Sequence, residues 1–165
     1  MADTELTTLL GVLNSQRAHV LSIVEGLDEE ALRRPVLPSG WTCLGLVHHL
    51  ALDDEKFWFR AVVSGEPAAI AEILEVEENA WRPAPEKTAE EVFALYRRES
   101  ELADALLAGA DLEAAPGWWP DFFGNWRYDN VREVILHVIT ETAAHVGHLD
   151  AVRELIDGRQ RLVVS

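Results

Sequence analysis

The chain has little of several features on which whole classes of proteins depend. Its 165 residues include one cysteine, Cys43, so neither a disulfide framework nor a cysteine-based zinc site can form within one chain. Basic residues number 14 against 29 acidic ones, and the formal net charge of −15 argues against nucleic acid and anionic membranes, which need a basic face. No apolar stretch approaches the roughly 20 residues that span a bilayer, and the acidic N-terminus lacks an apolar signal core, so we expect a cytoplasmic protein.

Two further absences narrow the chemistry. The sequence has no glycine-rich loop of the kind that cradles phosphates and no G-x-S-x-G nucleophile elbow. What it does have is a globular composition, with 48% hydrophobic residues and six tryptophans. A chain of this length fits one domain, so we expect residues 1–165 to form a single helical domain with a sizeable core.

The spacing of apolar residues predicts helices and no convincing strand. A capping box at Thr88 and Glu91 marks one helix start, and Gly158 marks a helix end. Short helical segments are expected at 28–34 and 68–76, and an irregular, aromatic-rich stretch at 109–125 is expected to fold back over the helices. The sequence therefore predicts an all-α fold, an up-and-down four-helix bundle. Its four helices are expected at about 3 or 4–25, 41–63, 88–107 and 129–156.

The last predicted helix carries two chemically active side chains in its apolar stripe. Glu141 and His145 stand where the spacing of three and four residues from Val138 to Leu149 calls for apolar side chains. An unpaired buried carboxylate is unfavourable, and a metal ion held by both groups, one helical turn apart, is one way to offset that penalty. A hydrogen-bonded Glu141–His145 pair without a metal explains the same pattern, and this helix alone does not decide between the two.

The second predicted helix offers a third ligand. His48 and His49 are adjacent, so their side chains point about 100° apart and one of them is expected to enter the core. Periodicity does not decide which. Two histidines and one carboxylate leave coordination positions open, as a catalytic metal requires, whereas a structural zinc site would use four protein ligands.

Other titratable residues surround these candidates. His148 lies near the edge of the same face as His145, where it can act as an outer partner, a fourth ligand or a proton carrier, and His137 lies one turn before Glu141. The acidic run 53–55 lacks the spacing of a calcium loop, so we expect it to be a solvated helix face. Cys43 is expected to be a buried small hydrophobe.

Two motifs resemble those of a known family. Residues 41–51, Trp-Thr-Cys-Leu-Gly-Leu-Val-His-His-Leu-Ala, followed by Phe57-Trp58-Phe59, resemble the second-helix signature of the DinB/YfiT-like superfamily. Residues 141–158 resemble the last segment of an actinobacterial-type branch of that superfamily. The resemblance spans nearly the whole chain and implies a four-helix bundle that holds a metal.

In that pattern, the metal ligands fall on His49, Glu141 and His145. Glutamate at 141, where many DinB-type members have histidine, resembles the thiol-dependent members, such as mycothiol-dependent maleylpyruvate isomerase. The sequence Val146-Gly147-His148 departs from the Arg-Gly-Gln of the bacillithiol-type enzymes, which leaves the identity of the thiol open.

The resemblance implies a divalent-metal-dependent S-transferase or isomerase that uses a low-molecular-weight thiol. Zinc or nickel is the expected metal, mycothiol or a related thiol the expected cofactor, and a homodimer the expected assembly. Either His148 or a metal-bound water is expected to transfer the proton in catalysis. A small electrophilic substrate is expected in a cavity lined by some of Trp58, Trp118, Trp119 and Trp126. Two alternatives stay open, a metal-dependent hydrolase and a non-catalytic stress-response or ligand-binding module with a structural metal.

Overall fold

The computed structural model describes residues 4–75 and 79–161, and over these residues it contains helices and no strand. The predicted all-α fold class is therefore confirmed. Two positions considered as helix ends, Asp3 and Val76, lie outside the described residues. In chain order the elements are α1 (Thr4–Val24), α2 (Glu29–Arg33), α3 (Cys43–His49), η1 (Leu50–Val63), α4 (Pro67–Glu75), α5 (Ala89–Leu107), η2 (Asp121–Phe123) and α6 (Val131–Asp157).

Side chains in the sequence explain where the main helices begin and end. The Thr42 side chain accepts a hydrogen bond from the Gly45 amide at 3.0 Å and starts α3. Thr88 and Glu91 form the predicted capping box at the start of α5. Gly158, with φ of 76°, ends α6, since glycine adopts this left-handed conformation readily. The helix boundaries lie within about two residues of those predicted.

The segment η1 continues α3 as one helix with a wider winding. From Leu50 to Val63 the backbone is π-helical, and the Ser64 amide donates to the Phe59 carbonyl five residues earlier, at 3.0 Å. A wider turn changes which side chains share a face. This element therefore does not follow the 3.6-residue period from which the sequence was interpreted.

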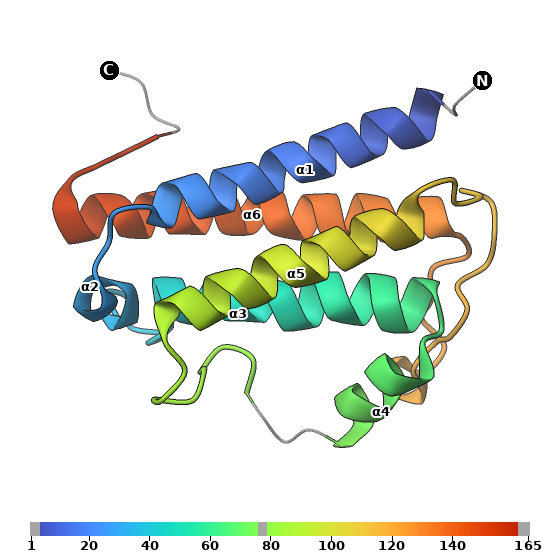
Figure 1. The fold of residues 1–165 in the computed structure, drawn as a ribbon, viewed down its shortest axis with the longest axis horizontal. Helices are drawn as coiled ribbons and strands as arrows, with labels where there is room; N and C mark the ends of the chain where they lie inside the picture. Colours follow the sequence, from blue (N-terminus) through green and yellow to red (C-terminus); the bar gives the residue numbers. More distant parts are fainter. Residues whose placement is uncertain (1–3, 76–78, 162–165) are drawn as a thin grey trace.

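Four long helical segments lie side by side, namely α1, α3 with η1, α5 and α6 (Figure 1). Their directions do not alternate. Arg132 of α6 pairs with Glu5 at the start of α1, and Arg153 donates to the Ile23 carbonyl at its end, so α1 and α6 are parallel. In the same way Arg60 of η1 pairs with Glu99 of α5.

The contact between His48 and Lys87 lies toward the start of the same two segments, so α3–η1 and α5 also run in the same direction. The predicted alternation of up and down was therefore wrong at the connection between η1 and α5. This connection contains α4 and is long enough to return to the end of the molecule where α3 begins (Figure 1).

A layer of buried polar side chains separates two apolar core clusters. Arg17 of α1 is 5% exposed and donates two hydrogen bonds, of 2.7 and 2.6 Å, to the Glu55 carboxylate, and a third of 2.6 Å to Asp104. Asp54 and Glu55 are 3% and 1% exposed. The prediction that residues 53–55 form a solvated face was therefore wrong for these two. Cys43 is fully buried, as predicted.

No helix among residues 4–75 and 79–161 is long and apolar enough to cross a membrane. The structure is that of a single chain, and the expected homodimer stays a prediction.

Candidate functional site

Two histidines from different helices meet at the centre of the candidate site. The rings of His49, at the end of α3, and His145, on α6, lie 5.1 Å apart between centroids and almost perpendicular, at 80°. Trp81 stacks on the His49 ring at 4.0 Å and lies 5.5 Å from the His145 ring. His48 is fully buried elsewhere, with its Nδ1 2.8 Å from the Ala80 carbonyl oxygen. Of the two adjacent histidines, His49 is therefore the one that faces α6.

Glu141 lies one turn before His145 on α6. Its Oε2 is 3.7 Å from His145 Nε2, and its side chain is 43% exposed. The three predicted metal ligands thus lie in one region of the molecule. Within the described part of the chain, however, no three side chains of histidine, cysteine, aspartate or glutamate are grouped closely enough to hold a metal ion.

The donor chemistry of these residues nevertheless fits a divalent cation. Burial, with His49 and His148 nearby, lowers the pKa of His145 to about 4, so its imidazole is neutral at pH 7 and can donate a lone pair. His49 Nδ1 contacts Asp53 Oδ2 at 2.7 Å. Such a carboxylate partner orients a histidine so that its other nitrogen, Nε2, is available for a metal.

His148, the predicted proton-transfer residue, lies behind His145. The two Nδ1 atoms are 3.4 Å apart, and the His148 ring also lies 6.3 Å from that of Trp41. Its side chain is exposed on the outer side of α6. His148 therefore contacts the candidate ligand His145 and solvent.

A cavity of about 460 Å³ lies beside these residues, between η1, α4, η2 and α6. We call it the site cavity. Three of the predicted site residues line it: His49, Glu141 and Trp58. Its lining residues are His49, Asp53, Asp54, Phe57, Trp58, Ile73, Phe122, Phe123, His137 and Glu141.

The other predicted tryptophans lie behind the cavity wall. Trp58 packs against Phe123, with nearly parallel rings 5.9 Å apart, and against Trp119 and Trp126, at 5.9 and 6.4 Å. Trp118 lies 6.4 Å from Phe57. Of the four tryptophans named in the prediction, Trp58 lines the site cavity, and Trp118, Trp119 and Trp126 do not. The aromatic stretch does fold back over the helices as predicted. The residues by which it lines the site cavity are two phenylalanines, Phe122 and Phe123.

Asp54 was not predicted to line the site, whereas His137 was noted one turn before Glu141. The Asp54 carboxyl is buried on η1, and among residues 4–75 and 79–161 its Oδ2 has no hydrogen-bond partner. His137 lies 4.5 Å from Trp58 between ring centroids, and burial lowers its pKa. Asp54 comes five residues after His49, which is about one turn of a π-helix. This spacing would have indicated a shared face, but no sequence pattern predicted the π-helical winding.

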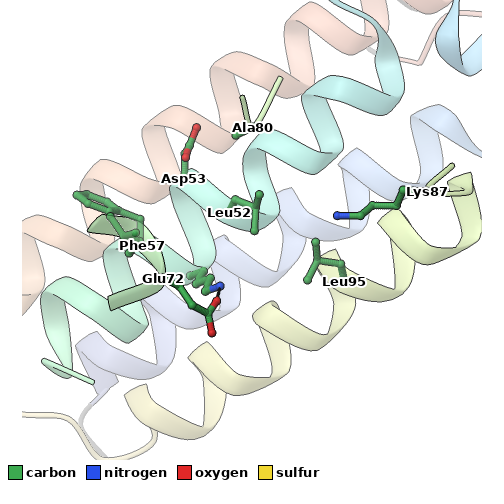
Figure 2. Close-up of a pocket in the computed structure, with 9 residues that line it drawn as sticks. Leu52, Asp53, Phe57, Glu72, Ala80, Lys87 and Leu95 are labelled. Atoms are coloured by element: carbon green, nitrogen blue, oxygen red, sulfur yellow. Dashed lines mark hydrogen bonds and ion pairs between the residues drawn. The ribbon is translucent and has the colours of Figure 1, made fainter. Parts of the chain in front are cut away.

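A second cavity, of about 350 Å³, adjoins the first and shares Asp53, Phe57 and Ile73 with it (Figure 2). It contains both lysines of the sequence, Lys56 and Lys87. Lys56 forms an ion pair with Glu72 of α4, and Lys87 Nζ is 3.2 Å from His48 Nε2. Figure 2 shows the Lys87 side chain pointing toward Leu52 and Leu95. The lining contains two lysines and two acidic residues, Asp53 and Glu72, so its formal charges balance.

Comparison with known proteins gives a family match over most of the chain. A family model described as Mycothiol-S-transferase matches residues 8–158. That range includes every residue named above as lining the site cavity. No curated protein matches the chain.

Proposed function

Because the chain belongs to the Mycothiol-S-transferase family, we propose that it transfers the sulfur of mycothiol to a small electrophile, with a divalent metal at His49, Glu141 and His145. The observation that carries the proposal is the meeting of His49 and His145 at 5.1 Å beside a cavity of about 460 Å³. A site at the edge of such a cavity can hold a thiol on one side and an apolar electrophile on the other.

The proposed ligands contribute three donor atoms. His49, held through Nδ1 by Asp53, presents Nε2, and His145, which is neutral at pH 7, presents a nitrogen lone pair. Glu141 contributes a carboxylate on a partly exposed side chain, which has the freedom to turn toward the histidines. When bound, a divalent ion such as zinc or nickel supplies the Lewis acidity that lowers the pKa of a thiol.

The protein residues around the ligands orient the groups and carry protons. Trp81 covers the His49 ring and restricts the approach of water from that side. His148 is the proposed proton carrier, because its exposed ring lies beside His145 and exchanges protons with solvent. Cys43 has no part in the transfer, since its thiol is fully buried and burial raises its pKa to about 11.

The aromatic wall of the site cavity fits the apolar part of an electrophile. Phe57, Trp58 and Phe123 line the cavity together with His49 and Glu141. An apolar group that stacks on these rings is held beside the proposed metal ligands.

The first test is the metal content of protein purified without a histidine tag, measured by plasma mass spectrometry. We expect about one divalent ion per chain in the wild type and its loss in His49→Ala and Glu141→Ala. His19→Ala on α1 and Glu154→Ala, an exposed position further along α6, are matched controls and should keep the ion.

Calorimetric titration with mycothiol follows on the same proteins. Binding that needs both the ion and His49 supports the proposal. A wild type that takes up neither zinc nor nickel would overturn the ligand assignment and leave Glu141 and His145 as a structural pair. Metal without mycothiol binding would favour the hydrolase or a structural metal, and loss of folding in chelator separates the latter.

A further inference from the structure

Asp54 is a buried carboxyl group without a hydrogen-bond partner for one of its oxygens. The residue is 3% exposed, it lines the site cavity, and its Oδ2 makes no hydrogen bond within the described chain. Buried polar atoms are nearly always paired, so an unpaired carboxyl oxygen at a cavity wall calls for a specific explanation.

The surroundings of Asp54 disfavour a negative charge. Asp53 and Glu55 flank it on η1, and Glu141 faces it from α6. Tyr96 of α5 is buried near it, with a hydroxyl that makes no hydrogen bond within the described chain, and the α6 histidine His137 lines the same cavity. The cation of this layer, Arg17, is already bound by Glu55 and Asp104.

Burial, reinforced by Glu141, Glu55 and Asp53, raises the pKa of Asp54 well above its ordinary value. This shift favours the neutral carboxylic acid form of Asp54. In that form the carboxyl group has a proton to donate to a molecule bound in the cavity that Asp54 lines.

We propose that Asp54 is the general acid of the transfer reaction, and that the substrates are electrophiles whose reaction releases an oxyanion, such as epoxides. This rests on the proposed S-transferase function. The other carboxyls of the cavity are less suited, because Asp53 is bound to His49 and is 52% exposed, and Glu141 lies beside His145 and is 43% exposed. His137 has a lowered pKa and is neutral.

The proposed step balances in atoms and charge. The thiol first loses its proton to solvent. Its sulfur forms a bond to an epoxide carbon while the carbon–oxygen bond breaks, and the alkoxide oxygen takes the proton from Asp54. Water then returns a proton to the Asp54 carboxylate, so that thiol and epoxide give a hydroxy thioether.

Two electrophiles with the same phenyl group test the assignment. Styrene oxide releases an alkoxide that needs a proton, whereas benzyl chloride releases chloride, which does not. With mycothiol as the thiol, we expect Asp54→Asn to slow transfer to styrene oxide by about 100-fold and to leave transfer to benzyl chloride within about twofold. Asp129→Asn, an exposed aspartate before α6, is the matched control and should change neither.

Thermal unfolding gives a readout that needs no activity. Because burial raises the pKa of Asp54 in the folded protein, the unfolded wild type ionises this carboxyl more readily at pH 7, so removing the carboxyl should stabilise the fold. We expect Asp54→Asn to unfold at a higher temperature than the wild type. If Asp54→Asn loses transfer to the epoxide and gains stability, then Asp54 serves function and not the stability of the fold.

Five outcomes overturn all or part of the proposal. Equal slowing with both electrophiles would make Asp54 a structural residue, and no slowing with the epoxide, or a lower unfolding temperature, would remove the argument for an acid. A wild type that transfers to benzyl chloride alone would exclude oxyanion-releasing substrates while leaving the S-transferase function intact. A wild type that transfers mycothiol to neither electrophile would overturn both proposals.

Discussion

The lowered pKa of His145 makes a quantitative prediction about stability in acid. Its side chain is 11% exposed, and its pKa is about 4 in the folded protein against 6.5 for an ordinary histidine. Well above pH 6.5 the imidazole is neutral in both states, so it contributes no pH dependence there. As the pH falls from 6.5 towards 4, the unfolded state takes up a proton that the folded state does not, and stability is lost.

The size of the effect follows from the two pKa values. At about pH 5 the difference costs roughly 2 kcal/mol of unfolding free energy, and at about pH 7.5 it is close to zero. His145→Gln cannot take up this proton. When the pH is lowered from about 7.5 to about 5, we therefore expect the variant to lose roughly 2 kcal/mol less unfolding free energy than the wild type.

Urea unfolding of metal-free protein, in chelator, measures the gap between wild type and variant at each pH. His19→Gln on α1 is the matched control, because it removes an imidazole outside the site. The reasoning would be refuted if the gap between wild type and His145→Gln were the same at both pH values. Such a result would mean that His145 is protonated as easily in the folded protein as in the unfolded chain, and the neutral ligand assigned to it would be lost.

Three further predictions concern the scaffold and the ion. Glu55→Gln should lower the unfolding free energy, measured in urea, by about 3 kcal/mol, because it leaves the buried Arg17 charge without its Glu55 partner. The double variant Arg17→Met with Glu55→Leu should recover most of that loss. A Glu55→Gln variant as stable as the wild type would contradict this prediction. Gly45→Ala should lower the melting temperature and weaken metal binding, since its Cβ would lie 2.1 Å from the Trp81 carbonyl oxygen, whereas Gly147→Ala, with open space, should not lower it. Chelation should change the melting temperature little, because the apolar core is complete without an ion, and a large drop would indicate a structural metal.

Helical periodicity was enough to predict where the helices lie, because each long helix buries one apolar stripe. It was not enough to predict their directions. Alternation is the default only for short connections, and the segment between Val63 and Ala89 includes α4 and is long enough to cross the length of a helix. The length of that connection was readable from the sequence, so the parallel arrangement of α3–η1 and α5 was open to prediction in principle.

The site was predictable where it depends on spacing within one helix. Glu141 and His145 are one turn apart, and the structure places them together as the sequence indicated. The choice between His48 and His49 needed the packing of α3 against α6, which no local pattern contains. The cavity wall was harder still, because Phe122 and Phe123 come from an irregular stretch whose path depends on tertiary contacts.

The prediction of a solvated face at residues 53–55 failed for two physical reasons, a distant ion-pair partner and an unusual helical winding. An acidic run is normally solvated because burying an ionised carboxylate without a partner costs far more than burying a neutral polar group. No local pattern indicated the partner, since Arg17 lies 38 positions before Glu55. Nor did any local pattern indicate the π-helical winding that places both Asp53 and Asp54 at the cavity.

Asp54 and Glu55 are neighbouring buried acids on η1, and we expect one to serve function and the other to stabilise the fold. Glu55 is buried with both oxygens bound by Arg17, so its negative charge is compensated and its removal should harm the fold. Asp54 is buried almost as deeply, yet its Oδ2 has no hydrogen-bond partner in the part of the chain that the structure describes, so the contacts seen in the fold give no reason to retain it. An apolar side chain of similar size would be more stable there. A carboxyl that weakens the protein and opens onto a cavity beside two histidines is therefore best explained by a ligand that completes its hydrogen bonding.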